Sequence, residues 1–251
     1  SESYKTIARK ELLHIYETEK EWQKAIDEAN IIQRQSGEDQ STRIAQLYCE
    51  LTQQNLYFKN FKGAAEALEK ALKVDPNNKR ALIIKGKMLK AKGDIDGALA
   101  TWKQVGQISP VYGTLVVEQI ASLLLEAGRK EEAVKYLEDL FKDGSTTDEV
   151  DTAGILLGKA GNSKEAITLI QEHLKTQPTL VAFYRLIDLR LANEPENESL
   201  KQLHGLLKNM LSKAVRYKCT KCGFATRKFL WRCPGCHQWE TFPPVRQENL
   251  S

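Results

Sequence analysis

The sequence predicts an all-α protein of stacked helix pairs that ends in a small knuckle folded around a metal ion. Three observations support this prediction. A helix-pair pattern recurs every 33 to 39 residues through most of the chain. Each recurrence carries a small residue where two helices would cross, and four of the five cysteines stand together near the C-terminus. Self-similarity at such a period is typical of repeat proteins, and clustered cysteine pairs are typical of metal sites.

The composition is that of a folded, water-soluble chain. Its 251 residues are 41% hydrophobic and 28% charged, with 37 Lys and Arg against 33 Asp and Glu. No stretch reaches the ~18 consecutive apolar residues of a membrane-spanning helix, since residues 115–125 are interrupted by polar side chains. The chain begins with Ser1 and shows no secretory signal, so we expect upstream sequence to be missing and the thiols to stay reduced.

The repeat is marked by one small residue near the start of the second helix of each pair. These residues are spaced 39, 34, 35 and 33 positions apart, at Ala25, Ala64, Ala98, Ala133 and Ala166. Twelve positions after three of them comes a proline, at Pro76, Pro110 and Pro178. A helix must stop there because the proline ring removes a hydrogen-bond donor and clashes with the preceding turn. The pattern therefore predicts where each second helix crosses its partner and where it ends.

Glycines mark the turns inside the later helix pairs. Gly93, Gly128 and Gly161 each stand five residues before one of the repeat alanines. Glycine closes a helix readily in the left-handed conformation, so each of them predicts a tight turn between two helices. Three positions before the alanine, an aromatic or aliphatic residue opens the second helix of the first three pairs, as Trp22, Phe61 and Ile95.

The helix pairs resemble the tetratricopeptide repeat family, whose period is about 34 residues. The segment from Phe61 to Asn78, FKGAAEALEKALKVDPNN, matches the second half of that repeat closely. The resemblance covers five units over residues 3–178. Gly86 fits the small position of the family's first helix, whereas Thr52 and residues 156–158 depart from the pattern.

One helix pair cannot bury its apolar face alone, so the pairs are expected to stack. We predict a tetratricopeptide-repeat superhelix over residues 1–215, which includes a weaker final pair at 179–193 and 196–215. The apolar residues at helical spacing belong to its core. They include Leu68, Leu72, Leu99, Trp102, Val134, Leu137 and Ile170.

Charged residues of the first helices are candidates for partner binding. The family geometry implies that alternate turns of these helices line a concave groove. By that rule Arg80, Lys87 and Lys90 lie in the groove of the third unit, and Asp148 and Asp151 lie in that of the fifth. We predict a groove that is basic in the middle and acidic toward its C-terminal end. An ordinary solvated helix face carries the same residue types and is the alternative.

The four clustered cysteines form two motifs of identical spacing. Cys219 and Cys222 make the first Cys-x-x-Cys pair, and Cys233 and Cys236 make the second after a gap of ten residues. Two residues between cysteines let both sulfurs turn toward one ion, and two such pairs complete a tetrahedron of four sulfurs. We therefore predict one tetrahedral metal ion, zinc or iron. Free thiols or a redox dithiol are the alternatives, but the thioredoxin-like context of a redox pair is missing.

The cysteine motifs predict a small rubredoxin-like or zinc-ribbon domain over residues 216–246, followed by a tail at 247–251. The gap between the motifs has room for two short strands. A module below ~40 residues usually needs a metal or disulfides to fold. The module carries five aromatic side chains besides Tyr217, namely Phe224, Phe229, Trp231, Trp239 and Phe242. We expect some of these to pack on the last helix pair.

The predicted metal site is closed, which argues against catalysis. Four sulfurs leave no coordination position for an activated water, and His237 is not needed as a ligand. The sequence holds no phosphate-binding loop, His-Glu-x-x-His pair or nucleophile elbow. We predict that the protein is not an enzyme.

Residues 213–232 are basic and carry no acid. Cations near thiolates balance the negative charge of a four-sulfur site, so the excess has a local explanation and nucleic acid is not the expected partner. An RNA-associated adaptor that uses this basic ribbon, or a general repeat chaperone, is the alternative function. The cations are Lys213, Arg216, Lys218, Lys221, Arg227, Lys228 and Arg232.

The order of the two modules resembles the bacterial lipopolysaccharide assembly protein B family. Tetratricopeptide repeats lead directly into YKCTKCGF and WRCPGC, and the segments EWQKAID at 21–27 and LYCEL at 47–51 also look like that family's. The resemblance implies a non-enzymatic adaptor that links the deacetylase committing material to lipid A to a membrane-bound protease for degradation. The implied partners are an FtsH-type protease, an LpxC-type deacetylase and other lipopolysaccharide assembly proteins.

The resemblance also implies a location. Family members begin with a single membrane anchor and further repeats facing the cytoplasm, and neither stands before Ser1. The chain is therefore expected to be a soluble C-terminal portion of a protein at the cytoplasmic face of the bacterial inner membrane.

Overall fold

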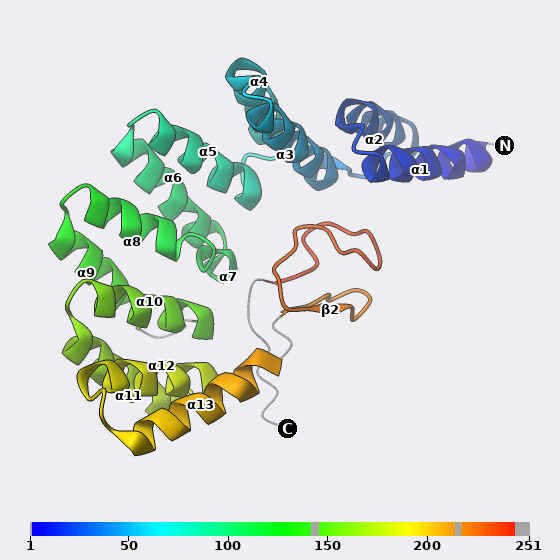
Figure 1. Ribbon diagram of the computed structural model, residues 1–251. Coiled ribbons are helices and arrows are strands. Elements are labelled where there is room, and N and C mark those ends of the chain that lie inside the picture. Colours follow the sequence, from blue (N-terminus) through cyan, green and yellow to red (C-terminus); the bar gives the residue numbers. More distant parts are fainter. Residues whose placement is uncertain (1, 142–145, 214–216, 244–251) are drawn as a thin grey trace. The chain divides into compact units, whose positions relative to one another are not determined.

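The computed structural model describes residues 2–141, 146–213 and 217–243, and these residues are helical apart from the small cysteine module (Figure 1). Two compact units divide the chain, Ser1–Ile108 and Ser109–Ser251. The arrangement confirms the predicted all-α tetratricopeptide-repeat fold with a small four-cysteine knuckle. Among the described residues, no helix is both long enough and apolar enough to cross a membrane.

The first unit consists of three helix pairs whose members pack against each other along the chain. Its helices are α1 (Glu2–Thr18), α2 (Trp22–Ser36), α3 (Ser41–Tyr57), α4 (Phe61–Val74), α5 (Lys79–Ala91) and α6 (Ile95–Ile108).

The second unit starts with a short helix at Pro110, where proline occupies the first helical position and needs no backbone donor. Its helices are α7 (Pro110–Gly113), α8 (Val117–Glu126), α9 (Lys130–Asp139), α10 (Thr147–Lys159), α11 (Ser163–Thr176), α12 (Leu180–Asn193) and α13 (Glu198–Lys213). The final pair α12 and α13 matches the weaker pair predicted from the sequence.

The repeat alanines lie at the helix crossings, as predicted. All five are fully buried: Ala25, Ala64, Ala98, Ala133 and Ala166. Gly86 of α5 serves the same purpose from the first helix, because a Cβ there would lie 2.2 Å from Nε1 of the buried Trp102 on α6. The Trp102 indole N–H donates to the Ile83 carbonyl at 3.2 Å, which fixes the ring against α5. Small residues at these positions allow the two helices of a pair to approach closely.

The turn glycines also behave as predicted, with positive φ at Gly93, Gly128 and Gly161. In the first two pairs the same conformation belongs to lysines, Lys20 with φ of 60° and Lys59 with φ of 58°. This could not be predicted from the sequence, because only glycine is an obvious marker of a left-handed residue. The backbone turn is thus common to these pairs although its residue type differs.

A buried ion pair links successive first helices in both units. Arg43 of α3 contacts Glu17 of α1 at 2.8 Å, and Arg80 of α5 contacts Glu50 of α3 at 2.8 Å. Arg185 of α12 contacts a carboxylate of α10 at 2.9 Å in the same way. A buried charge is costly unless its partner is in place, so these pairs favour one register of helix stacking over others.

The cysteine module contains two short antiparallel strands, β1 (Tyr217–Lys218) and β2 (Ala225–Thr226). The prediction of two strands between the cysteine pairs is wrong for the described residues. Strand β1 instead precedes the first pair, and an isolated bridge joins Arg232 to Trp239 around the second. Each pair therefore lies inside its own hairpin. The predicted boundary at 215 and the tail at 247–251 lie outside the described residues.

Candidate metal centre

The structure brings the four clustered cysteines together at one point. Their Sγ atoms all lie within 4.8 Å of one another. Two of these distances cross from one motif to the other, with 3.7 Å between Cys219 and Cys236 and 3.6 Å between Cys222 and Cys233. None of the four forms a disulfide.

The first motif folds as a knuckle around its own backbone. The Cys219 N–H donates to the Phe224 carbonyl at 2.8 Å, and the Gly223 N–H donates back to the Cys219 carbonyl at 3.0 Å. Gly223 has a φ of 76°, as expected for a tight return turn. The Lys221 N–H points at the Cys219 sulfur at 3.4 Å, which favours a negatively charged thiolate there.

The second motif repeats this geometry fourteen residues later. The Cys233 N–H donates to the Gln238 carbonyl at 2.9 Å, the His237 N–H donates to the Cys233 carbonyl at 2.9 Å, and the Gly235 N–H approaches the Cys233 sulfur at 3.4 Å. His237 occupies the place of the turn glycine with a φ of 60°. Its backbone completes the knuckle, and its side chain is outside the cluster of candidate ligands.

The sulfur geometry fits a four-coordinate metal ion. A tetrahedron with metal–sulfur bonds of about 2.3 Å has edges of about 3.8 Å, close to the sulfur distances of 3.7 Å and 3.6 Å between the two motifs. A disulfide would need about 2.05 Å. Cys219 and Cys233 are buried, whereas Cys222 is exposed at the surface. The donor set is therefore a closed, all-sulfur tetrahedron at the edge of the module.

The electrostatics of the cluster call for a cation. Burial alone would raise the pKa of Cys219, but hydrogen bonds from the Thr241 hydroxyl and from two backbone N–H groups lower that pKa to about 6. At Cys236 the backbone N–H of Gln238 lowers the pKa, yet burial and the three neighbouring cysteines outweigh it and raise the pKa to about 12. Four thiolates cannot share so small a volume without a positive charge between them, and a divalent ion would supply it.

An aromatic cluster attaches the cysteine module to the helices of the second unit. Tyr112 of α7 stacks on Trp231 with ring centroids 5.6 Å apart and meets the edge of Phe229 at 6.4 Å. Burial and the nearby Glu240 carboxylate raise the pKa of Tyr112. Phe229 and Trp231 thus make ring contacts with α7, a helix that the sequence-based prediction of packing on the last helix pair did not include. No sequence signal marked Tyr112, because its short helix lies outside the repeat pattern.

The predicted groove residues fall into two groups. Arg80 and Asp151 are buried and belong to the ion pairs that link successive first helices. Lys87 and Lys90 are exposed on α5, and Asp148 is partly exposed in the first turn of α10. The first group links neighbouring helices, and the second group lies at least partly at the surface.

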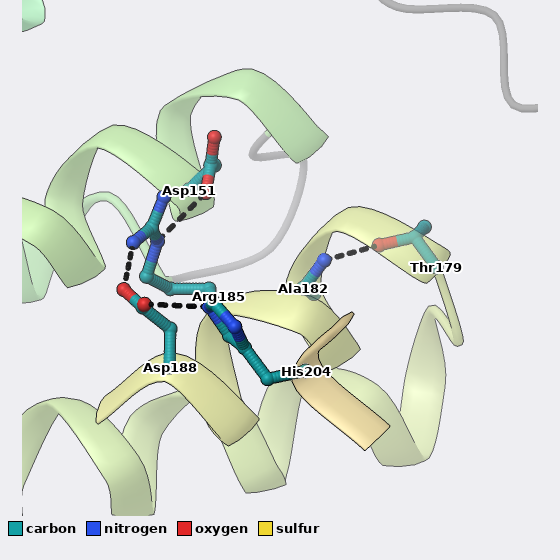
Figure 2. A network of polar contacts seen from close by, with 6 residues as sticks. All are labelled: Asp151, Thr179, Ala182, Arg185, Asp188 and His204. Carbon is teal, nitrogen blue, oxygen red and sulfur yellow. Dashed lines mark hydrogen bonds and ion pairs between the residues drawn. The ribbon is translucent and has the colours of Figure 1, made fainter. Parts of the chain in front are cut away.

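A polar network joins α10, α12 and α13, as Figure 2 shows. Arg185 bridges Asp151 and Asp188, and the other oxygen of Asp188 lies 3.1 Å from Nε2 of His204 on α13. Tyr184 stacks on the His204 ring at 4.9 Å. This network connects the last helix to its neighbours. Its residues come from three helices and form no known motif, so the network could not be predicted from the sequence.

Two family models match the chain. The model described as "Tetratricopeptide repeat-like domain" matches residues 30–196, and the model described as "Rubredoxin metal binding domain" matches residues 217–244. A solved structure titled "Functional Characterization of Pseudomonas Aeruginosa pilF" is similar with a TM-score of 0.46 and 18% identity, over 85% of this chain and 95% of that one.

The chain is also similar to curated proteins over almost its whole length. It is 31% identical over 244 residues to lipopolysaccharide assembly protein B of Escherichia coli K12, and 29% identical over 253 residues to that of Haemophilus influenzae. These matches cover 95% and 96% of this chain but 62% of each relative. The chain belongs to the lipopolysaccharide assembly protein B family, with a tetratricopeptide repeat-like region followed by a rubredoxin metal binding domain.

Proposed function

We propose that the protein is a non-enzymatic adaptor that regulates lipopolysaccharide assembly. In this proposal the repeats bring an LpxC-type deacetylase, which commits material to lipid A, to an FtsH-type protease that degrades it. The whole protein acts at the cytoplasmic face of the inner membrane, held there by an anchor outside this chain. The supporting observation is the similarity to lipopolysaccharide assembly protein B, which extends through both the repeats and the cysteine module.

The adaptor works by holding surfaces in place. Stacked first helices, linked by buried ion pairs, present exposed side chains at fixed spacing. We propose that Lys87 and Lys90 of α5 and Asp148 of α10 contact partners, while Arg80 and Asp151 position those helices. Charged side chains at such a surface affect the rate and specificity of association more than its affinity alone.

The metal has a structural part in this proposal. Cys219, Cys222, Cys233 and Cys236 would hold one zinc or iron ion, which when bound cross-links the two knuckles and neutralises their thiolates. The knuckles then keep the aromatic face of the module against Tyr112 of α7. With all four coordination positions filled by sulfur, the ion activates no water.

Partner capture tests the adaptor function. The immobilised 251-residue chain should retain both the purified protease and the purified deacetylase, and a Lys87→Glu/Lys90→Glu variant should bind at least one of them about tenfold more weakly. Lys164→Glu/Lys175→Glu on α11 makes the same charge change at two exposed sites of another helix and should leave binding unchanged.

Failure to capture either enzyme would contradict the adaptor proposal. Equal losses in the α5 and α11 variants would instead show a general effect of charge and remove the assignment of the α5 surface. Salt-sensitive RNA binding that is lost on changing Lys221, Arg227 and Lys228 would favour the RNA-associated alternative.

A further inference from the structure

Three aromatic side chains are exposed at and beside the turn between α3 and α4. Tyr57 is 82% exposed, Phe58 is 70% exposed and Phe61 is 65% exposed. The Tyr57 and Phe58 rings meet edge to face, with centroids 5.2 Å apart. We call residues 57–62 the aromatic tip. Single exposed apolar residues are common, but a group of large exposed rings marks an interaction surface.

In the first and third helix pairs, the apolar residue that opens the second helix is less exposed than Phe61. Phe61 opens α4 as Trp22 opens α2 and Ile95 opens α6, three residues before the repeat alanine. Trp22 is 9% exposed and Ile95 is half-buried. In these two pairs the apolar side chain turns inward, so the exposure of Phe61 is not a requirement of the fold.

The backbone of the aromatic tip is held in one shape. The Lys59 N–H donates to the Leu56 carbonyl at 3.0 Å, and the Asn60 N–H donates to the Asn55 carbonyl at 2.8 Å. The Asn60 side chain accepts from the Gly63 N–H at 3.1 Å and so caps α4. A surface whose backbone is already ordered loses little conformational entropy on binding.

The charge of the aromatic tip is positive. Lys59 and Lys62 are both exposed, and residues 51–65 contain no Asp or Glu. Within the described part of the chain neither lysine takes part in an ion pair. Both ammonium groups are thus available beside the three rings for a negatively charged surface.

We infer that the aromatic tip inserts into the headgroup region of an anionic phospholipid bilayer. Aromatic rings that partition to the membrane interface, flanked by lysines that attract acidic lipids, are the composition of an interfacial anchor. A protein partner would need pockets for three projecting rings, whereas a lipid surface accepts them without shape matching. This inference goes beyond the proposed adaptor function and rests on separate residues.

Vesicle flotation tests the inference with the 251-residue chain. We expect it to bind vesicles of phosphatidylethanolamine with 30 mol% phosphatidylglycerol more strongly than vesicles of phosphatidylcholine, and to release as salt screens the lysines. The Lys59→Gln/Lys62→Gln variant should lose about thirtyfold in partitioning to the anionic vesicles, since each lysine near such a surface contributes about a factor of five to six.

The rings are tested separately from the charge. The Tyr57→Ser/Phe58→Ser/Phe61→Ser variant should lose at least about tenfold on the anionic vesicles. It should unfold at the wild-type temperature, because all three side chains are exposed in the folded state. Phe183→Ser on α12 removes an aromatic ring that is 38% exposed elsewhere and should leave vesicle binding unchanged.

A depth measurement completes the test. Tryptophan placed at Phe58 should be quenched by lipids brominated near the glycerol, beyond the quenching of the native tryptophans, whereas tryptophan at Phe183 should not.

The inference is wrong if the wild type does not bind anionic vesicles or if the three-serine variant binds them equally well. It is also wrong if that variant keeps vesicle binding but loses capture of the protease or deacetylase, since the tip would then bind protein. Partner capture without vesicle binding would support the adaptor proposal and contradict the inference of membrane insertion.

Discussion

At the scale of single residues, charged side chains that look alike in the sequence differ in burial. Arg80 and Lys87 both lie on α5 and both were predicted to line a groove, yet Arg80 is buried and Lys87 is exposed. Arg80 donates to Glu50 at 2.8 Å and to Gln53 at 3.0 Å. A guanidinium is suited to this position because it offers several donors in a fixed plane.

The Arg80 contacts predict a large difference between two α5 substitutions. Arg80→Ala should lower the free energy of unfolding by about 2–3 kcal/mol, because Glu50 loses its cation in a poorly solvated place. Lys87→Ala should change it by less than about 0.5 kcal/mol, as is usual for an exposed residue. Urea denaturation followed by circular dichroism measures both. Similar effects of the two substitutions would show that Arg80 does not link α5 to α3.

A second residue-scale prediction concerns His173 of α11. Burial lowers its pKa below 6.5, and its Nε2 has no hydrogen-bond partner among the described residues. The unfolded chain therefore binds a proton at a pH where the folded chain does not, so stability should be fully present above about pH 6.5 and decline as the pH falls below it. His173→Gln should flatten this decline in denaturation curves between pH 7 and pH 5. An unchanged slope would contradict the assignment.

At the scale of elements, the helix pairs were predictable because their signals are local and repeated. A buried alanine at each crossing and a left-handed glycine after a first helix follow from backbone geometry alone. The cysteine cluster was predictable for the same reason, since its spacing is that of a metal knuckle. Tertiary contacts were not predictable: the stacking of Tyr112 on Trp231 and the links from Arg185 to Asp151 and from Asp188 to His204 depend on which surfaces meet.

Two helix glycines give a matched prediction at this scale. A Cβ on Gly86 would lie 2.2 Å from the Trp102 indole, whereas a Cβ on Gly205 of α13 would meet nothing within 4 Å. Gly86→Ala should therefore destabilise the protein by about 1–3 kcal/mol through overpacking. Gly205→Ala should stabilise it by about 0.5–1 kcal/mol through helix propensity. Thermal denaturation of the two variants should show shifts of opposite sign, and shifts of the same sign would contradict the close crossing of α5 and α6.

At the scale of the whole molecule, the chain combines repeats that fold by stacking with a module too small to depend on its own core. Cys219, Cys233 and Phe242 are the buried centre of that module, and Tyr217, Phe229 and Leu230 pack around them. So few apolar side chains cannot offset the entropy of ordering the segment without a cross-link. In the proposed adaptor, a metal ion held by the four cysteines would supply that cross-link.

Metal removal should affect the two parts of the molecule differently. A chelator under reducing conditions should disorder the cysteine module, expose Trp231 and shift its fluorescence to the red, while the helical circular dichroism stays largely unchanged. A Trp231→Phe variant identifies the source, because most of the fluorescence change should disappear in it. Loss of most helical signal on chelation would mean that the repeats also depend on the ion.

The metal content of the freshly purified chain tests the central claim most directly. Elemental analysis should give one equivalent of zinc plus iron per chain, with a colourless protein if zinc is bound and a visible charge-transfer spectrum if iron is bound. Cys219→Ser/Cys233→Ser should carry almost none. A wild-type protein without a stoichiometric metal, still folded in its cysteine module, would contradict the assignment of the four cysteines as a metal centre.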